Sequence, residues 1–483
     1  MSRVSRRSIG AVVVVTAMTA SLPLALTTPA AGVEVREETC TPTEENRPVC
    51  GADLPPETAA FLDPTARVTD PEHVDVGHRV YIAPFALLAA APSAPISLAA
   101  ESNVQDNVRV FGSVPRRSAV LAAMAAAGLG RGSGVEIGER VILAHGSEVR
   151  GPARIGVDAS EPDDGEGGGE GTHGDDGPSS AAVVERTSAQ PTGAAAAEQE
   201  AEDSGVFLSF GAQVDGAVLE RDTALSALSR VGPGVRLRSG TVVLPGKNVT
   251  TQEQADDPGL GKVRPLLETD VAFNAAVVEV NVGLAREYAR LAREDASAVR
   301  GINVDPGGNE FDQSRDAPSV ESALCTGPQV REPDARNRVI GDVCFEDSLE
   351  DLERKLGSSI SIRADEGGPF GIGTIAQMDD RVVFHALEGS DLRVGERVEY
   401  GDRAIVHGGG RPQVDATTGL AAPTIIGNDV ALGSRSVVFR SLLRNGTVVG
   451  FKSAVVGSET ALEQEIAPRT IYANNVVVGP VEW

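Results

Sequence analysis

The chain has 483 residues, which is enough for two or three domains, and it carries a formal net charge of −26 at pH 7. A charge of this sign argues against nucleic acid or an anionic membrane surface as a binding partner. Aromatic residues make up only 4% of the chain, whereas glycine occurs 54 times. We therefore expect a fold whose core needs few aromatic side chains and whose backbone turns often.

The N-terminal residues have the pattern of an export signal. Arg6 and Arg7 precede an apolar run at 11–18 and small residues at 30–32. This order predicts a signal peptide over residues 1–32 and a secreted or cell-envelope protein. The arginine pair fits a twin-arginine signal or an ordinary positively charged leader. The apolar run is too short to span a bilayer and no later run is longer, so no membrane span is expected.

Four cysteines form two local pairs in the sequence, Cys40 with Cys50 and Cys325 with Cys344. In an exported protein this arrangement predicts two short-loop disulfides. A zinc site made of all four thiolates is the alternative, but the spacing contains no Cys-x-x-Cys pair to favour it.

Apolar residues recur at intervals of six over much of the chain. A period of six fits neither an α-helix nor a hairpin meander, and it is typical of a parallel β-helix with a triangular coil. Each short face of such a coil turns one aliphatic side chain inward, and small residues form the corners. Representative series are Val76, Ile82 and Leu88; Ile137, Leu143, Val149 and Ile155; and Val394, Tyr400 and Val406.

The repeat occurs in two blocks, which predicts an all-β chain with two tandem β-helix domains. The first domain is expected over residues 33–300 and the second over residues 357–483. The first contains an acidic segment, 158–204, which lacks large apolar residues and is expected to be disordered. The first domain ends in an accessory helix, which is expected at 283–297. A loop-rich linker at 301–356 holds the second cysteine pair.

Residues 363–388 carry the side chains with the clearest chemical meaning. This stretch contains Arg363, several carboxylates and His385. An imidazole ligand, a cation that holds an anion and carboxylates that move protons are the groups used in metal-assisted hydration. The chain has only six histidines, so the number of available metal ligands is the central question.

Several runs resemble the gamma-class carbonic anhydrases: residues 102–108, 143–153, 274–285, 362–369 and 383–388. The resemblance implies a left-handed β-helix that assembles as a trimer and holds zinc, iron or cobalt with three histidines between neighbouring subunits. The implied reaction is the reversible hydration of carbon dioxide to bicarbonate by a metal-bound hydroxide, a lyase (carbonate dehydratase) activity. Three imidazoles leave one metal position open, where the pKa of water falls to about 7.

The first block matches only part of the family's site. The family's first and third histidines fall on Phe111 and Arg150, so this block alone cannot hold a metal with three histidines. His145 matches a metal ligand. Gln105 and Asn274 match residues that orient water or substrate in the family.

The second block is nearly the complement of the first. His385 and His407 match metal ligands, while the third histidine is again missing. The family's arginine–aspartate pair stabilises subunit contacts and orients bicarbonate, and its glutamates relay protons. These groups fall on Arg363, Asp365, Glu366 and Glu388.

Two interpretations of the histidines remain open. In one, His385 faces His407 of a second copy or His145 of the first block, and two imidazoles hold a metal together with Asp379 or Asp415. In the other, the site is degenerate and the histidines are hydrogen-bonded interface residues.

The other matched residues also have structural alternatives. Gln105 and the adjacent Asp106 are alternatively hydrogen-bonding residues of an interface. Asn274 is alternatively the cap of a turn, and the pair Arg363 and Asp365 alternatively serves assembly alone.

Three functions of different classes follow from these observations. The first is a secreted gamma-carbonic-anhydrase-like enzyme that acts on carbon dioxide and bicarbonate and forms a homo-oligomer of the trimer type. The second is a catalytically inactive β-helix scaffold or binding protein. The third is a hexapeptide-repeat acyltransferase, which the predicted export disfavours because acyl-CoA is not expected outside the cytoplasm. Metal content separates the first two.

Overall fold

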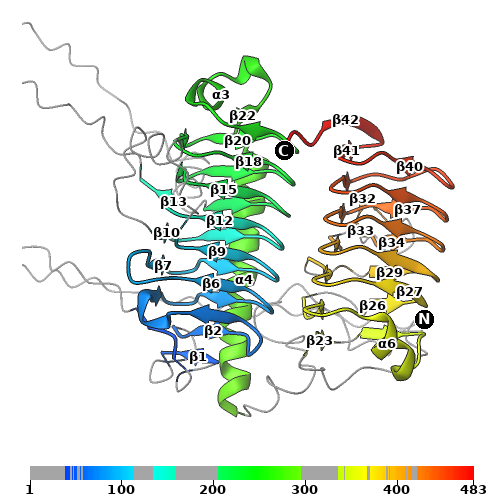
Figure 1. Cartoon of the computed structure of the whole chain (residues 1–483), viewed down its shortest axis with the longest axis horizontal. Coiled ribbons are helices and arrows are strands. Elements are labelled where there is room, and N and C mark those ends of the chain that lie inside the picture. Colours follow the sequence, from blue (N-terminus) through cyan, green and yellow to red (C-terminus); the bar gives the residue numbers. More distant parts are fainter. Residues whose placement is uncertain are drawn as a thin grey trace, which may run out of the picture. The chain divides into compact units, whose positions relative to one another are not determined.

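Figure 1 shows the computed structural model of the chain, in which short strands stack into coils. The structure describes residues 39–43, 46, 48–51, 55, 58–113, 134–158, 205–294, 336–341, 343–366, 370–387, 390, 392–409, 411–414 and 421–483. The expected signal peptide, nearly all of the acidic segment and most of the linker lie outside these residues. Among the expected disulfides, Cys40 is bonded to Cys50, whereas Cys325 is outside the described residues.

The first β-helix has three parallel sheets, one for each face of the coil. One sheet contains β1 (Val49–Cys50), β2 (Ala60–Leu62), β5 (Tyr81–Ile82), β8 (Asn103–Val104), β11 (Val141–Leu143), β14 (Val206–Leu208), β17 (Thr223–Leu225), β20 (Thr241–Val243) and β22 (Val263–Pro265). The second contains β4 (Val74–Val76), β7 (Ile96–Leu98), β10 (Val135–Ile137), β13 (Ala153–Val157), β16 (Val218–Glu220) and β19 (Arg236–Leu237). The third contains β3 (Arg67–Thr69), β6 (Leu87–Ala89), β9 (Arg109–Phe111), β12 (Glu148–Arg150), β15 (Gln213–Asp215), β18 (Arg230–Val231) and β21 (Asn248–Val249). Only the pairings β1–β2 and β20–β22 are antiparallel among the described strands of this β-helix.

The second β-helix repeats this plan. Its first sheet contains β23 (Arg338–Gly341), β25 (Ser361–Ala364), β28 (Val383–His385), β31 (Ile405–His407), β36 (Val437–Phe439), β39 (Ala454–Val456), β41 (Thr470–Ala473) and the antiparallel β42 (Val476–Pro480). The other two sheets contain β24 (Val343–Phe345), β26 (Phe370–Ile372), β29 (Leu392–Val394), β34 (Thr424–Ile426) and β37 (Leu442–Leu443), and β27 (Ile375–Met378), β30 (Val398–Tyr400), β35 (Ala431–Leu432), β38 (Val448–Val449) and β40 (Glu465–Ile466). The strands β32 (Arg411–Val414) and β33 (Ala421–Ala422) form a separate antiparallel pair.

The six-residue series predicted from the sequence fill the two coil interiors. Val76, Ile82 and Leu88 are buried in the core of the first β-helix, and Tyr400 and Val406 in that of the second. Successive coils repeat the same register, so aliphatic side chains stack on one another along each interior. The prediction of a left-handed parallel β-helix is confirmed.

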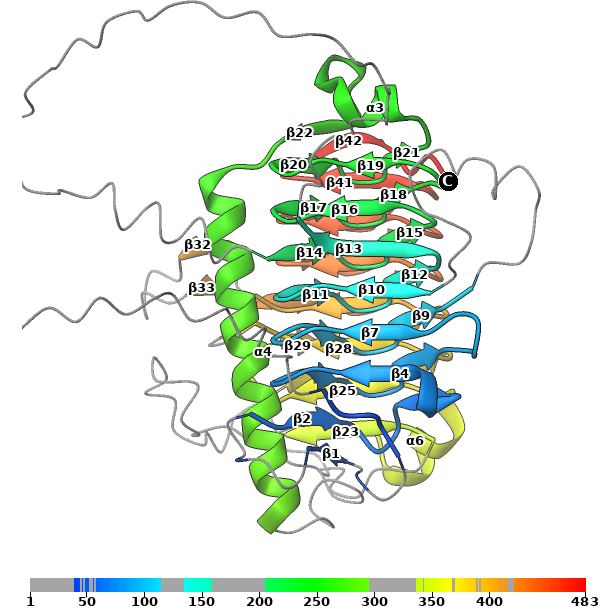
Figure 2. The same ribbon diagram turned by 90° about the vertical axis from the view of Figure 1, so that its left-hand side faces the viewer.

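A few helices accompany the two β-helices. Besides the short η1 (Pro71–His73), α3 (Gln252–Asp256), η2 (Pro258–Leu260) and α6 (Leu349–Lys355), a long helix α4 spans Glu268–Glu294. Figure 2 shows α4 running along the first β-helix, where it contacts β2, β5 and β11. The helix was expected only from residue 283. Its first half is rich in valine, a weak helix former, and burial of Val277 and Val278 overrides that weak propensity.

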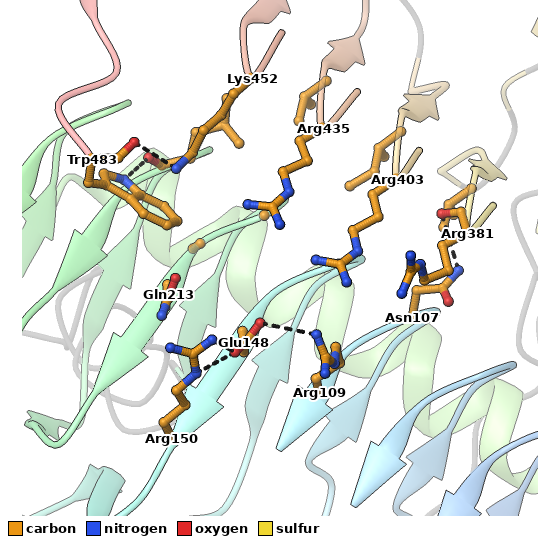
Figure 3. Close-up of a pocket in the computed structure, with 17 residues that line it drawn as sticks. Asn107, Arg109, Glu148, Arg150, Gln213, Arg381, Arg403, Arg435, Lys452 and Trp483 are labelled. Atoms are coloured by element: carbon orange, nitrogen blue, oxygen red, sulfur yellow. Dashed lines mark hydrogen bonds and ion pairs between the residues drawn. The ribbon is translucent and has the colours of Figure 1, made fainter. Parts of the chain in front are cut away.

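A hydrophobic cluster joins the two β-helices. In β11 the side chains of Val141 and Leu143 pack in the coil interior, so Ile142 points outward. In the same way, Val383 of β28 and Ile405 of β31 point out of the second β-helix. They belong to the same cluster as Ile142 of the first β-helix. At the amino-terminal ends of these second-coil strands, basic side chains project towards the first β-helix (Figure 3). Within the described residues, no helix is both long and apolar enough to cross a membrane.

Candidate metal centre

Strand alternation in the second β-helix determines where two of the histidines point. Phe384 and Val406 pack in the coil interior, so their neighbours His385 and His407 face outward, towards the first β-helix. These two histidines are register partners on the adjacent strands β28 and β31. Both are almost completely buried.

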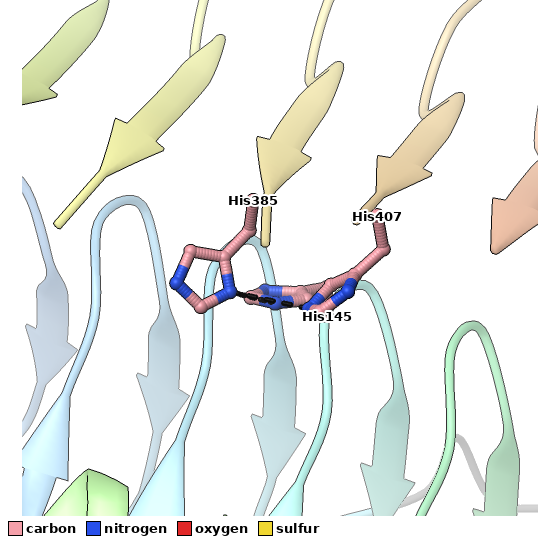
Figure 4. A group of neighbouring side chains, drawn as sticks. All are labelled: His145, His385 and His407. Atoms are coloured by element: carbon pink, nitrogen blue, oxygen red, sulfur yellow. Dashed lines mark hydrogen bonds between the residues drawn. The ribbon is translucent and has the colours of Figure 1, made fainter. Parts of the chain in front are cut away.

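His145 approaches this pair from the first β-helix, where it lies in the turn after β11. Its Nε2 is 3.1 Å from Nδ1 of His385, and the same Nδ1 is 3.2 Å from Nε2 of His407. Figure 4 shows the three rings converging. The cluster is therefore assembled from both β-helices of one chain.

The second nitrogen of each ring faces an oxygen outside the cluster. Nδ1 of His145 is 3.0 Å from Asp106, and Nδ1 of His407 is 2.6 Å from the carbonyl oxygen of Gly408. Nε2 of His385 is 3.1 Å from Glu366 and 3.3 Å from Asp365. Oxygens in these places favour an N–H on the outer nitrogen, which leaves a lone pair on each inner nitrogen.

This geometry fits a metal ion with three imidazole ligands. Three lone pairs that face one another inside a protein repel unless a cation lies between them. Metal–nitrogen bonds of about 2.0–2.1 Å in a tetrahedral site place the nitrogens about 3.3–3.4 Å apart. The observed separations of 3.1 and 3.2 Å lie close to that spacing. A fourth position would remain open, as in catalytic rather than structural sites.

The three rings have different proton affinities. Burial lowers the pKa of His145 to about 4 despite the neighbouring Asp106, and burial together with the other two histidines holds the pKa of His407 well below its usual value. Burial and Arg363 also disfavour charge on His385, but the carboxylates of Glu366 and Asp365 outweigh them and raise its pKa to about 9. Without a metal, His385 is therefore protonated at neutral pH and its Nδ1–H lies between the inner nitrogens of the other two rings; a metal ion would replace that proton and restore the lone pair.

A buried ion-pair network supports the cluster and spans both β-helices. The guanidinium of Arg363 donates to Asp106 of the first β-helix, at 2.9 Å, and to Asp365. Burial alone would raise the pKa of Asp106, but Arg363 and His145 reverse this and hold it well below the usual range. The hydroxyl of Tyr288, on α4, donates to Asp365 at 2.6 Å. Both carboxylates are thus fixed as acceptors for the outer nitrogens of the histidines.

The cluster opens into a cavity of about 220 Å³. One wall is the apolar face of α4, including Phe273, Val277 and Val280. Gln105 and the guanidinium of Arg440 also line this cavity. The cavity therefore combines an apolar wall with a few polar groups next to the imidazoles, as small-molecule sites commonly do.

The remaining predicted residues fall in different places. Glu388 and Asp415 lie outside the described residues. Asp379 is exposed on the surface, so it does not contribute to the histidine cluster. Asn274 is buried inside helix α4 rather than capping a turn, because the helix begins earlier than expected.

Two residues near the site were missed by sequence reasoning. Tyr288 lies on the part of α4 that was expected to be helical, and its spacing from Arg363 and Asp365 along the chain gives no sign of contact. Arg440 lines the cavity with a buried Nε that has no hydrogen-bond partner among the described residues. The sequence shows Arg440 only as a basic residue at a corner of a coil, and nothing in the repeat links it to the cavity.

Comparison with known proteins gives a consistent result. No family model matches the chain. The carbonic anhydrase of Methanosarcina thermophila is 31% identical over 195 residues, which cover 38% of this chain and 75% of that protein. The carboxysome assembly protein CcmM of Synechococcus elongatus is 32% identical over 98 residues, which cover 18% of this chain and only 16% of that protein. A solved structure of a Bacillus cereus protein described as an acetyltransferase is 16% identical, covers 30% of this chain and 74% of that one, and has a TM-score of 0.13, which carries no argument.

The coils and the cluster define a class: a left-handed β-helix protein with a buried three-imidazole centre between two coils. The match to three quarters of the Methanosarcina protein then specifies the family. The chain belongs to the gamma-class carbonic anhydrase family.

Proposed function

We propose that the chain is a carbonic anhydrase that hydrates carbon dioxide reversibly at a single composite site. His145, His385 and His407 would hold the metal, which is zinc, iron or cobalt. One observation carries the proposal: the inner nitrogens of these three rings meet at metal-ligand spacing. When bound, a metal with an open position lowers the pKa of water to about 7 and supplies the nucleophile for hydration.

The surrounding residues suit both carbon dioxide and bicarbonate, the two carbon-containing reactants. The apolar face of α4 admits carbon dioxide, which is uncharged. Arg440 offers a positive charge to bicarbonate in the same cavity, and Gln105 offers an amide to orient substrate or water. Glu366 lines the cavity beside His385, 3.1 Å from its Nε2, where a carboxylate can accept and release protons.

The site needs no second copy of the chain. The resemblance to the family implies that neighbouring subunits provide the histidine ligands. In this chain the first and second β-helices provide the three histidines. We therefore propose that the first and second blocks are paired domains of one functional unit. Trimer-type assembly and export from the cell stay predictions.

The test is hydration of carbon dioxide by the purified chain loaded with zinc, cobalt or iron, measured by stopped flow. His385→Ala should abolish the metal-dependent rate. His73→Ala is the matched control, since His73 is a partly exposed histidine beside Glu72. If no metal yields hydration above the His385→Ala background, the enzyme proposal is wrong and the inactive scaffold remains.

A further inference from the structure

A second cavity, of about 200 Å³, lies between the two β-helices at the opposite ends of the strands that carry the histidines. His385 and His407 end β28 and β31, whereas Arg381 and Arg403 lie just before these strands begin. Figure 3 shows basic side chains reaching into this space from both sides. Those lining it are Arg109, Arg150, Arg381, Arg403, Arg435 and Lys452.

Four of these residues form a row along the second β-helix. Arg381, Arg403, Arg435 and Lys452 occupy equivalent corners of successive coils, where the backbone has φ values of 59°, 59°, 59° and 52°. The same left-handed conformation occurs at other corners of both β-helices, for example at Arg79 and Arg397, so it places the four side chains in a row without itself marking a site. The first β-helix faces the row with Gly146 and Gly211, where a larger residue would crowd the side chains of Ile405 and Leu228.

The charges around this cavity do not balance. Arg381 bonds to Asp402, which is also 3.7 Å from Arg403; Arg109 and Arg150 share Glu148, and Arg150 also lies 3.8 Å from Asp215. Arg435 has no side-chain ion pair within the described part of the chain, although it lines the cavity. In a protein with a net charge of −26, this local excess of positive charge is specific to the site.

Burial and neighbouring cations together affect Lys452. Its amino group lies 3.2 Å from the centre of the Trp483 ring and donates to the Trp483 main-chain oxygen. Burial and the arginines Arg435, Arg469 and Arg230 lower its pKa to about 7. An anion in the cavity would relieve this repulsion.

We propose that this cavity binds an oxyanion of the phosphate class, either free phosphate or a phosphoryl group on a larger molecule. Arginine guanidinium groups match phosphate oxygens in pairs of hydrogen bonds. Coils repeat about every 4.8 Å, so the row offers one cation per coil to a multivalent anion. The inference is independent of the proposed hydration activity.

The chain provides its own reporter for the test. Trp483 is the single tryptophan and lines the cavity beside Lys452. We expect saturable changes in tryptophan fluorescence when inorganic phosphate or pyrophosphate is titrated into the full-length protein at low salt. Arg435→Gln should weaken binding at least about tenfold, because charge-assisted hydrogen bonds are the strong ones. Arg403→Gln should weaken it similarly.

Arg397→Gln is the matched control. Arg397 is also an arginine at a left-handed corner of the same β-helix, and like Arg435 it is exposed, but it does not line the cavity and it pairs with Asp429 and Glu396. Its substitution should leave phosphate binding unchanged. Glycerol phosphate, a phosphate monoester of similar charge to phosphate, distinguishes the sources: binding at least as tight as that of phosphate would identify a phosphoryl group of a larger molecule, and much weaker binding would identify free phosphate. Absence of a saturable response, or equal binding by wild type and Arg435→Gln, would overturn the proposal.

Discussion

The first β-helix contributes one imidazole to the histidine cluster, and the second contributes two. The first also provides Asp106 and Gln105, whereas the second provides Arg363, Asp365 and Glu366. Each β-helix therefore lacks site residues that the other provides. The comparison teaches that two coils within one chain can divide a three-histidine site between them, provided that their outward faces hold them in register.

The largest expected effect comes from removing one ligand on either side of this division. His145→Ala in the first β-helix and His407→Ala in the second should reduce metal-dependent hydration equally. We expect a loss of more than about 100-fold, since even groups that only orient a ligand are worth about 10- to 100-fold. Stopped-flow rates check this. An active His145→Ala protein would mean that the second β-helix works alone.

Asp106→Asn should have the next largest effect, because it leaves the buried Arg363 with one partner fewer. We expect a loss of about 3–5 kcal/mol in the free energy of unfolding, measured with urea. Metal affinity should fall about 10- to 100-fold as His145 loses its carboxylate.

Asp63→Asn is the control for that substitution. Asp63 forms another buried pair across the two β-helices, with Arg338 at 3.1 Å. It should destabilise the protein similarly while changing metal affinity little. Equal metal affinity in the two variants would show that Asp106 serves assembly alone.

Tyr288→Phe should have a smaller effect. The change removes the hydrogen bond to Asp365 and should lower the free energy of unfolding by about 1 kcal/mol. Metal affinity should fall less than in Asp106→Asn. Tyr81→Phe is the comparison, since the Tyr81 ring stacks on Tyr288 and its hydroxyl is not bonded to Asp365. Identical effects of both changes on metal affinity would show that the hydrogen bond is unimportant.

The basic cavity gives the smallest expected effect, a pH dependence. Lys452 gains its proton as the pH falls through about 7, despite Arg435, Arg469 and Arg230. Sulfate, whose charge is constant in this range, should therefore bind about five- to tenfold more tightly at pH 6 than at pH 8. Tryptophan fluorescence measures this affinity. Lys452→Met should remove the dependence, and its persistence in that variant would exclude Lys452 as the cause.

The sequence predicts the coils well because their interiors depend on local periodicity. The series through Val76, Ile82 and Leu88 specifies which side chains enter the coil, and the structure buries all three. The start of α4 was less predictable, since the valines before residue 283 favour strands and only packing makes them helical.

The joining of the two β-helices could not be derived from periodicity. It depends on outward residues such as Ile142 and Val383, which are more than two hundred positions apart and follow no repeat. The sequence therefore offered His145 and His407 as alternative partners of His385, whereas the structure brings both to it. The first block thus obtains its two missing ligands from the second, and the second obtains its one missing ligand from the first.

Metal content per chain tests the composite site most directly. After loading with zinc and desalting, elemental analysis should find one metal ion per chain in the wild type and none in folded His145→Ala protein. Folding is checked by circular dichroism, and His73→Ala should retain one ion. A stoichiometric ion in His145→Ala, or none in the wild type, would contradict the account.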